Sequence, residues 1–174
     1  MDEHETIPRR DVAGLVVPPK IGAVRPADDP VLPWIVVDET GEQVESVSDF
    51  LRNLLACGNS PASCRSYAYD LLRWLRFLAA ADIGWHRAQR TEVRDFVLWL
   101  RTSDNPARHR RRPDAPAPGS VNVRTGKPYL GTGYAPATIN HAVAVLSAFM
   151  TITWRPAGGR WCRRCRRGPA MAAG

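Results

Sequence analysis

The segment Asn59–Leu78, NSPASCRSYAYDLLRWLRFL, constrains the fold more than any other part of this chain. Ser60 can accept hydrogen bonds from the backbone N–H groups at a helix N-terminus. Pro61 suits the first helical position, because the N–H that it lacks would have no partner there. Apolar residues then recur at helical spacing, at positions 67, 71, 74, 75 and 78. The opposite face carries Arg65, Ser66, Tyr69, Arg73 and Arg76. We predict an amphipathic helix whose polar face suits a phosphate backbone.

Three further segments have the periodicity of amphipathic helices. The first begins near Val44 and ends at Gly58, which we expect to cap its C-terminus. The second runs from Thr91, as N-cap, to Arg101, and the third begins at Pro136. Their predicted apolar positions are 47, 50, 51, 54 and 55, then 93, 96, 97 and 100, and finally 139, 142, 143, 146 and 149. Position 145 is expected on the outside, and the tryptophans at 74, 85 and 99 are expected in the core.

The remaining residues carry few regular signals. Residues 33–38, PWIVVD, predict one short strand within an otherwise flexible leader. Residues 102–135 form a long connection rich in Arg, Pro and Gly, where Asn122–Tyr129 predicts a small hairpin about a Thr-Gly turn. We therefore expect an all-α protein. It comprises an acidic leader over 1–43, a four-helix bundle over 44–149 with a long loop insertion before the last helix, and a disordered Arg-rich tail over 150–174.

The net charge differs sharply between regions of the chain. Residues 1–50 hold four Lys/Arg and eleven Asp/Glu, a net charge of −7. Residues 51–149 hold fourteen basic and six acidic residues, a net charge of +8, and residues 150–174 hold six arginines and no acid. A basic folded segment behind an acidic leader favours an anionic partner, such as duplex DNA.

Other classes of protein are disfavoured. No apolar run approaches the roughly 18–20 residues that span a bilayer, so we expect no membrane partner. The polar N-terminus argues against a secretory signal and favours a cytoplasmic protein whose four cysteines stay thiols. Cys162 and Cys165 have metal-ligand spacing, but no second Cys or His pair is near enough to complete a zinc site. We expect no metal, no cofactor and no small-molecule substrate.

Two of the predicted helices together resemble a known family. SPASCRSYAYDLLRWLRFL, followed about sixty residues later by YAPATINHAVAVLSAF, resembles the N-terminal SAM-like core-binding domain of tyrosine recombinases, the phage-integrase family. The loop GSVNVRTGKPYLGTGY resembles an insertion found in actinobacterial and plasmid-borne members. The resemblance covers roughly residues 44–149. It implies a domain that forms half of a clamp around duplex DNA and contacts mainly phosphates.

Carried over by position, the resemblance implies DNA contacts from three segments. They are Ser60, Ser63, Arg65, Ser66 and Arg73 on the helix at 59–78, Thr138, Asn140 and His141 on the last helix, and Lys127 and Tyr129 on the loop. Two alternatives stay open. Arginines on a surface helix, Arg76 among them, are often simply solvated, and His141 can instead form a hydrogen bond within the bundle.

The resemblance also implies a catalytic domain that we do not find here. In the family, a second domain supplies an Arg, a Lys, a His-x-x-Arg, a further His or Trp, and a Tyr nucleophile. The twenty-five residues after Phe149 contain no His, Lys or Tyr, so we expect no enzyme activity. The helical pattern also breaks at Met150. Because MTITWRPA can spell YDYHLEAG in the neighbouring reading frame, we expect a gene truncated by a frameshift after Phe149.

Two functions from different classes therefore remain. The first is the DNA-binding domain of an integrase, involved in DNA integration and recombination but without its catalytic partner. Such a domain is either inert or occupies DNA sites in competition with intact recombinase protomers. The second is a small basic helical domain that binds an acidic protein. An enzyme is the weakest reading, because the four histidines are scattered and no catalytic pairing has a recognisable spacing.

Overall fold

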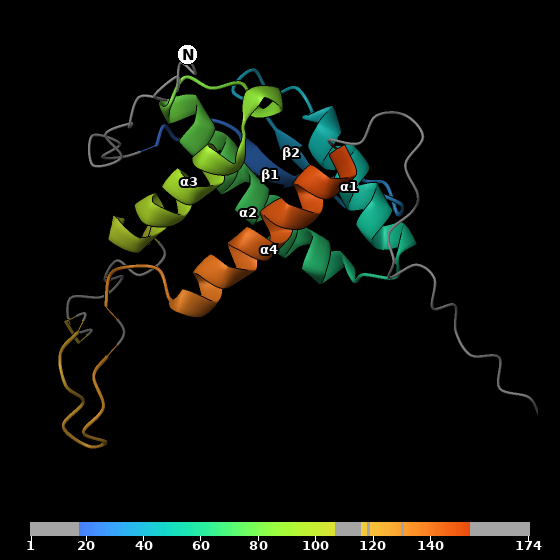
Figure 1. Ribbon diagram of the computed structural model, residues 1–174. Helices are drawn as coiled ribbons and strands as arrows, with labels where there is room; N and C mark the ends of the chain where they lie inside the picture. The colour runs from blue at the N-terminus through green and yellow to red at the C-terminus, as the bar shows by residue number, and fades with distance from the viewer. Residues whose placement is uncertain (1–17, 107–115, 118, 130, 154–174) are drawn as a thin grey trace, which may run out of the picture. The chain divides into compact units, whose positions relative to one another are not determined.

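The computed structural model describes residues 18–106, 116–117, 119–129 and 131–153, and these are mostly helical. Within these residues the chain forms two short strands, four α-helices and the 3-10 turn η2 (Trp85–Arg87), and Figure 1 labels the strands and α-helices. Their bounds are β1 (Ala23–Pro26), β2 (Trp34–Val37), α1 (Glu45–Ala56), α2 (Pro61–Ala80), α3 (Arg90–Thr102) and α4 (Pro136–Thr153). The four predicted helices are confirmed, and the all-α prediction is corrected to mostly α with a small sheet.

The chain divides into two compact units. The larger unit contains Pro19–Phe77 and α4 from Asn140 onward, and therefore holds the sheet, α1 and most of α2. The smaller unit contains Leu78–Ile139, and therefore holds η2, α3 and the connection that leads into α4. Two helices, α2 and α4, contribute residues to both units.

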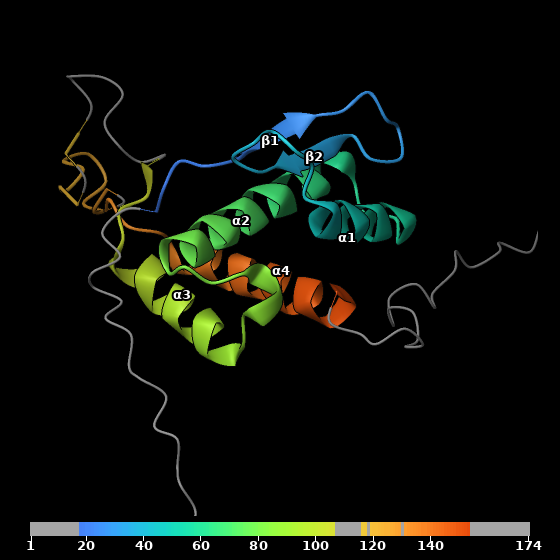
Figure 2. The ribbon, with the colours of Figure 1, turned by 90° about the horizontal axis from the view of Figure 1, so that it is seen from above.

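The sheet of the larger unit corrects the predicted leader. The predicted strand is present as β2, and β1 pairs with it antiparallel, so that Ala23 lies opposite Val37 and Pro26 opposite Trp34. In Figure 2 the sheet lies alongside α1 and α2. The sheet buries Val36 and Val37, which are 0% and 5% exposed. The sequence concealed β1, because four residues that include an arginine and a proline show no apolar alternation.

The ends of α1 and α2 follow local rules that the sequence carried. The Ser63 N–H donates to Ser60 Oγ at 3.1 Å, so Ser60 caps α2 as predicted. Gly58 ends the turn after α1 with φ of +81°, a left-handed conformation that glycine adopts at little cost. The cap of α3 differs from the prediction. Gln89 is the N-cap, and its N–H donates to the Glu92 carboxylate at 2.6 Å, so Thr91 lies within the helix.

The last helix is longer than predicted. It continues four residues past Phe149, and the Thr151 and Thr153 hydroxyls donate to the backbone carbonyls of Ser147 and Phe149. The predicted break at Met150 is therefore wrong by one helical turn. The predicted disordered tail from 154 onward, and the Cys162–Cys165 pair, lie outside the described residues.

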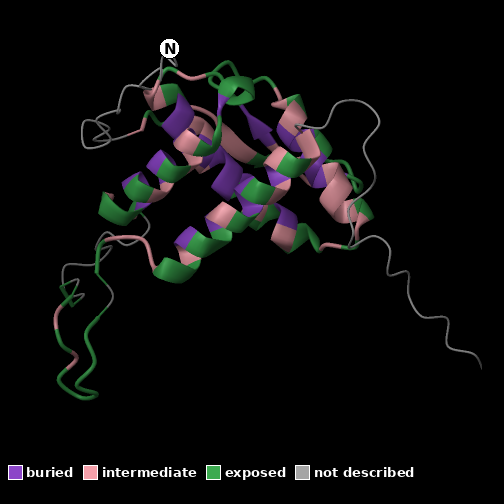
Figure 3. Ribbon diagram, viewed as in Figure 1, coloured by how far each residue is buried: buried purple, intermediate pink, exposed green. Residues whose placement is uncertain are grey.

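Buried residues form stripes along the helices (Figure 3). In the larger unit, the Phe50 ring meets the Phe149 ring edge-on with centroids 5.5 Å apart. Val145 is only 2% exposed, whereas the sequence predicted it outside and Val143 inside. The stripe of α4 runs through 142, 145, 146 and 149, because these positions share a helix face with the bulky Phe149 ring.

The buried face of α3 is also rotated from the prediction. Phe96, Trp99 and Leu100 are buried, while Val93 and Val97 are half-buried. A tryptophan ring offers more apolar area than a valine, so burying Trp99 determines the orientation. Trp74 is buried as predicted, but Trp85 is 37% exposed, so its prediction as a core residue is wrong.

Two expectations from composition also change. Cys64 is a buried free thiol, but Cys57 is disulfide-bonded, so the prediction of four thiols is wrong there. By length and composition α4 could cross a membrane, contrary to the sequence prediction. One such helix is weak evidence for a span, because the core helix of a soluble protein passes the same test.

Candidate nucleic-acid interface

Arg65 is the most prominent cation on the exposed face of α2. Its guanidinium lies over the Trp34 ring, 4.8 Å from the centroid, and 5.7 Å from the centroid of the Tyr69 ring. Tyr69 lies four residues further along α2, whereas Trp34 belongs to β2, so the sheet contributes to holding Arg65. Cation–π contacts at exposed sites each contribute about 0.5–1 kcal/mol. Because Arg65 is exposed and no described acid pairs with it, its charge remains available to an anion.

Asp70 joins α2 to α4 within the larger unit. Its side chain is only 7% exposed, yet it lies between two polar partners. Oδ1 accepts a hydrogen bond from Arg73 Nη1 at 2.6 Å, and Oδ2 lies 2.6 Å from His141 Nδ1. Both partners were predicted DNA contacts. The structure therefore brings Arg73 and His141 together through a carboxylate that sequence reasoning missed.

This arrangement changes how Arg73 and His141 can act. The side chain of Arg73 is 25% exposed and that of His141 is 44% exposed, so both reach the surface while bonded to Asp70. The Tyr67 ring meets the His141 ring edge-on, with centroids 5.3 Å apart. The predicted alternative for His141, a hydrogen bond within the bundle, is confirmed. Its remaining surface can still meet a ligand, but Asp70 offsets part of the local positive charge.

Arg76 has a structural partner. Its Nε donates to the Ile21 carbonyl oxygen at 2.7 Å, and Nη2 donates to the Gly22 carbonyl oxygen at 2.9 Å. Burial, together with the nearby Arg73 charge, lowers the pKa of Arg76 from its ordinary value. Gly22 has φ of +65°, and a Cβ there would lie 2.5 Å from the Val37 carbonyl oxygen. The alternative that Arg76 is merely solvated is therefore wrong.

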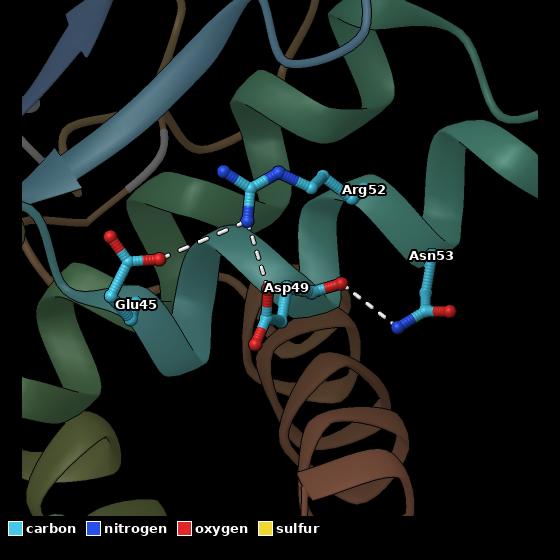
Figure 4. A network of polar contacts seen from close by, with 4 residues as sticks. All are labelled: Glu45, Asp49, Arg52 and Asn53. Atoms are coloured by element: carbon cyan, nitrogen blue, oxygen red, sulfur yellow. Dashed lines mark hydrogen bonds and ion pairs between the residues drawn. The ribbon is translucent and has the colours of Figure 1, made fainter.

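The single arginine of α1 is also engaged. Figure 4 shows Arg52 between two acids of its own helix. Its Nη1 lies 2.8 Å from Asp49 Oδ1 and 3.8 Å from Glu45 Oε2, and the Asn53 side chain donates to the Asp49 carbonyl oxygen at 2.9 Å. This cluster leaves α1 without a net positive surface, which fits the absence of α1 residues from the predicted interface.

The other predicted contacts fall into both units. Ser60 and Ser63 lie together at the start of α2, with their hydroxyl oxygens 3.0 Å apart. Ser66 is exposed in the next turn, and Asn140 is exposed on α4. Three predicted contacts belong to the smaller unit, whereas Arg65 belongs to the larger one. They are Lys127, Tyr129 and Thr138.

Sequence reasoning missed Trp34 and Asp70. The pairing of Asp70 with Arg73 has a local signal, because the two residues are three apart on one helix. The contact with His141 has none, because the two residues are 71 positions apart. Trp34 was predicted within a strand, but nothing in the sequence links that strand to Arg65. Within the described part of the chain, no cluster of three or more His, Cys, Asp or Glu is suited to hold a metal ion.

Comparison with known proteins gives a family match over part of the chain. Residues 47–112 match the family model described as the phage integrase N-terminal SAM-like domain. The predicted resemblance is thus confirmed over α1, α2 and α3, and it is consistent with the core-binding domain of a tyrosine recombinase. No curated protein and no solved structure matched the chain.

Proposed function

We propose that this chain is a DNA-binding module of the tyrosine recombinase type, which acts in DNA integration and recombination by binding the duplex backbone. The family match supports the class, and Arg65 is the observation that carries the binding role. An exposed guanidinium held over an aromatic ring, without an acidic partner among the described residues, suits a phosphate.

The finer form of the proposal is a SAM-like four-helix core-binding bundle over residues 44–149, with a long insertion between α3 and α4. In this proposal Ser60, Ser63 and Ser66 donate to phosphate oxygens beside Arg65, and Asn140 and His141 do so from α4. Such contacts position a protein on DNA and read little sequence. Arg73 contributes less, because Asp70 already binds its guanidinium at 2.6 Å.

The same proposal assigns binding without catalysis. The proposal attributes no strand cleavage to the residues named above, whose role in it is to hold phosphates. The site of action would be the cytoplasm, with duplex DNA and intact recombinase protomers as partners. No cofactor or small-molecule substrate enters the proposal.

A salt titration of DNA binding tests the role of Arg65. The full chain and Arg65→Gln are titrated against a fluorescent mixed-sequence duplex, and anisotropy gives the affinity at each salt concentration. A lost phosphate contact makes the slope of log K against log salt shallower by about 0.9. The matched control is Arg25→Gln, which removes the same charge from the same unit. Arg25 of β1 pairs with Ile35 of β2, the residue next to Trp34. Because successive side chains of a strand point to opposite faces, Arg25 lies on the sheet face opposite to that of Trp34.

The outcomes separate the two classes of function. The proposal holds if the wild type binds with a steep salt dependence and only Arg65→Gln makes the slope shallower. It fails if binding is flat with salt, or if both variants behave like the wild type. In that case the basic protein-interaction domain becomes the better account.

A further inference from the structure

The connection before α4 contains a hairpin, Gly119–Tyr129, whose backbone is organised by its own hydrogen bonds. The Asn122 N–H donates to the Lys127 carbonyl oxygen at 2.9 Å, and the Tyr129 N–H donates to the Ser120 carbonyl oxygen at 2.7 Å. An antiparallel bridge joins Val121 and Pro128 between these bonds. These backbone contacts hold the two arms together.

The tip of the hairpin is fixed by Asn122. Its side-chain oxygen accepts from the Arg124 N–H at 3.0 Å and from the Thr125 N–H at 3.3 Å, and its carbonyl oxygen accepts from the Gly126 N–H at 2.8 Å. Gly126 has φ of +66°, which glycine adopts readily. Asparagine side chains stabilise turns in this way, so the tip has a defined shape.

The hairpin presents cations and an apolar side chain to solvent. Val123 at the tip is fully exposed, and Arg124 and Lys127 on either side are also exposed. Neither cation forms an ion pair with a described residue. From the hairpin to the end of α4 the sequence contains no Asp or Glu, and the nearest acid before the hairpin is Asp114.

We propose that this hairpin is a second DNA-contacting element, in which Arg124 and Lys127 bind phosphates and Val123 enters the groove between them. The proposal rests on the proposed DNA-binding function, but not on the α2 face. A two-stranded ribbon fits the major groove, which is about 12 Å wide, and an apolar side chain there can contact a thymine methyl group. A protein partner is less well supported, because the residue at the fully exposed tip is a valine, and valine is under-represented among the residues that contribute most to protein interfaces.

The test compares two double variants of the full chain. Arg124→Gln/Lys127→Gln removes both hairpin charges, and the control Arg90→Gln/Arg101→Gln removes two exposed charges from α3 in the same unit. Each is titrated with salt against a fluorescent mixed-sequence duplex. Two lost phosphate contacts should make the slope of log K against log salt shallower by about 1.8. A fourfold rise in salt concentration should therefore reduce the DNA affinity of the wild type about twelvefold more than that of the hairpin variant.

A second measurement tests the apolar tip. Val123→Asn keeps the hairpin charge and should weaken binding to a duplex containing thymine more than binding to the same duplex with uracil, which lacks the C5 methyl group. Circular dichroism of every variant checks that the helices are retained. All these substitutions are at exposed positions, so their melting temperatures should match that of the wild type.

The outcomes distinguish this proposal from the one before it. The hairpin proposal is supported if the hairpin variant alone has a shallower slope and the Arg65→Gln effect persists in its background. It is overturned if the hairpin and α3 variants have equal slopes, or if Val123→Asn weakens binding to both duplexes equally. If the wild type does not bind the duplex, the proposed function itself fails and the hairpin proposal fails with it.

Discussion

The contacts of Asp70 lead to a quantitative prediction about stability. Asp70 is a nearly buried carboxylate whose two oxygens each lie 2.6 Å from a partner, Arg73 on its own helix and His141 on α4. Replacing it with asparagine keeps the size of the side chain but removes the charge and converts one acceptor into a donor. The amide oxygen can still accept from Arg73, but the amide nitrogen then faces His141 Nδ1 and bonds to it only in the tautomer whose Nδ1 is an acceptor. Both contacts lose the negative charge of the carboxylate, so both should weaken.

The magnitude follows from opposing terms. Hydrogen bonds to charged groups each contribute about 1.5–3 kcal/mol. Arg73 and His141 are 25% and 44% exposed, so water can replace part of each lost bond. Neutralising Asp70 also relieves the cost of burying a charge, which amounts to several kcal/mol before compensation. We expect a net loss of about 1–2 kcal/mol in the free energy of unfolding for Asp70→Asn, which lowers the melting temperature by about 4–8 °C per kcal/mol.

A double-mutant cycle in urea isolates the interhelical bond. The variants are Asp70→Asn, His141→Gln and the double variant, and the expected coupling free energy is about 1 kcal/mol. Asp49→Asn serves as the control, because its ion pair with Arg52 is exposed and should contribute less than about 1 kcal/mol. The reasoning is refuted if the Asp70 and His141 effects add to within about 0.3 kcal/mol, or if the control costs as much as Asp70→Asn.

Four further predictions concern single side chains. Ser60→Ala should lower the free energy of unfolding in urea by about 1 kcal/mol, because the variant loses the N-cap of α2. Ser60→Asp should not lower it, because aspartate is also a favoured N-cap residue. Arg76→Met should lower the unfolding free energy by about 1.5–3 kcal/mol through its lost backbone bonds, without the change in salt slope expected of Arg65→Gln. Ser48→Ala should raise the free energy of unfolding by about 1 kcal/mol, because the Ser48 hydroxyl is buried and has no hydrogen-bond partner among the described residues; a destabilised variant would contradict this. Burial raises the pKa of the Cys64 thiol and lowers its thiolate fraction at neutral pH. Alkylation followed by mass spectrometry should therefore label Cys64 much more slowly in folded than in unfolded protein.

The features that the sequence predicted correctly are those whose causes are local. Ser60, Pro61 and the apolar spacing that follows them all act within a few residues, so the start and course of α2 could be read directly. Gly58 is predictable for the same reason, because its left-handed φ of +81° is a backbone preference of one residue. Local chemistry thus accounts for the helices and their caps.

The features that the sequence did not predict depend on contacts between distant residues. The strand β1 exists because β2 supplies its hydrogen-bond partners, and its own residues give no signal. The rotation of α3 toward Trp99 and the burial of Val145 on α4 depend on which side chains fill the available volume. The network around Asp70 joins residues 71 positions apart. Helical periodicity alone could not distinguish Arg65 from Arg76. The charge of Arg65 remains available to an anion, whereas Arg76 donates to a backbone carbonyl just before β1.

This difference among arginines affects how the charge of the chain should be interpreted. Residues 51–149 carry a net charge of +8, which suggests many phosphate contacts. Four of its arginines already have partners in the structure, namely Arg52, Arg73, Arg76 and Arg94. A cation bonded to an acid or carbonyl must exchange that bond for a phosphate, whereas a solvated cation only exchanges water and counterions. The slope of log K against log salt should therefore reflect the few unpaired cations on the proposed contact surfaces, chiefly Arg65, Arg124 and Lys127. We expect this slope to be much shallower than a count based on the net charge would give.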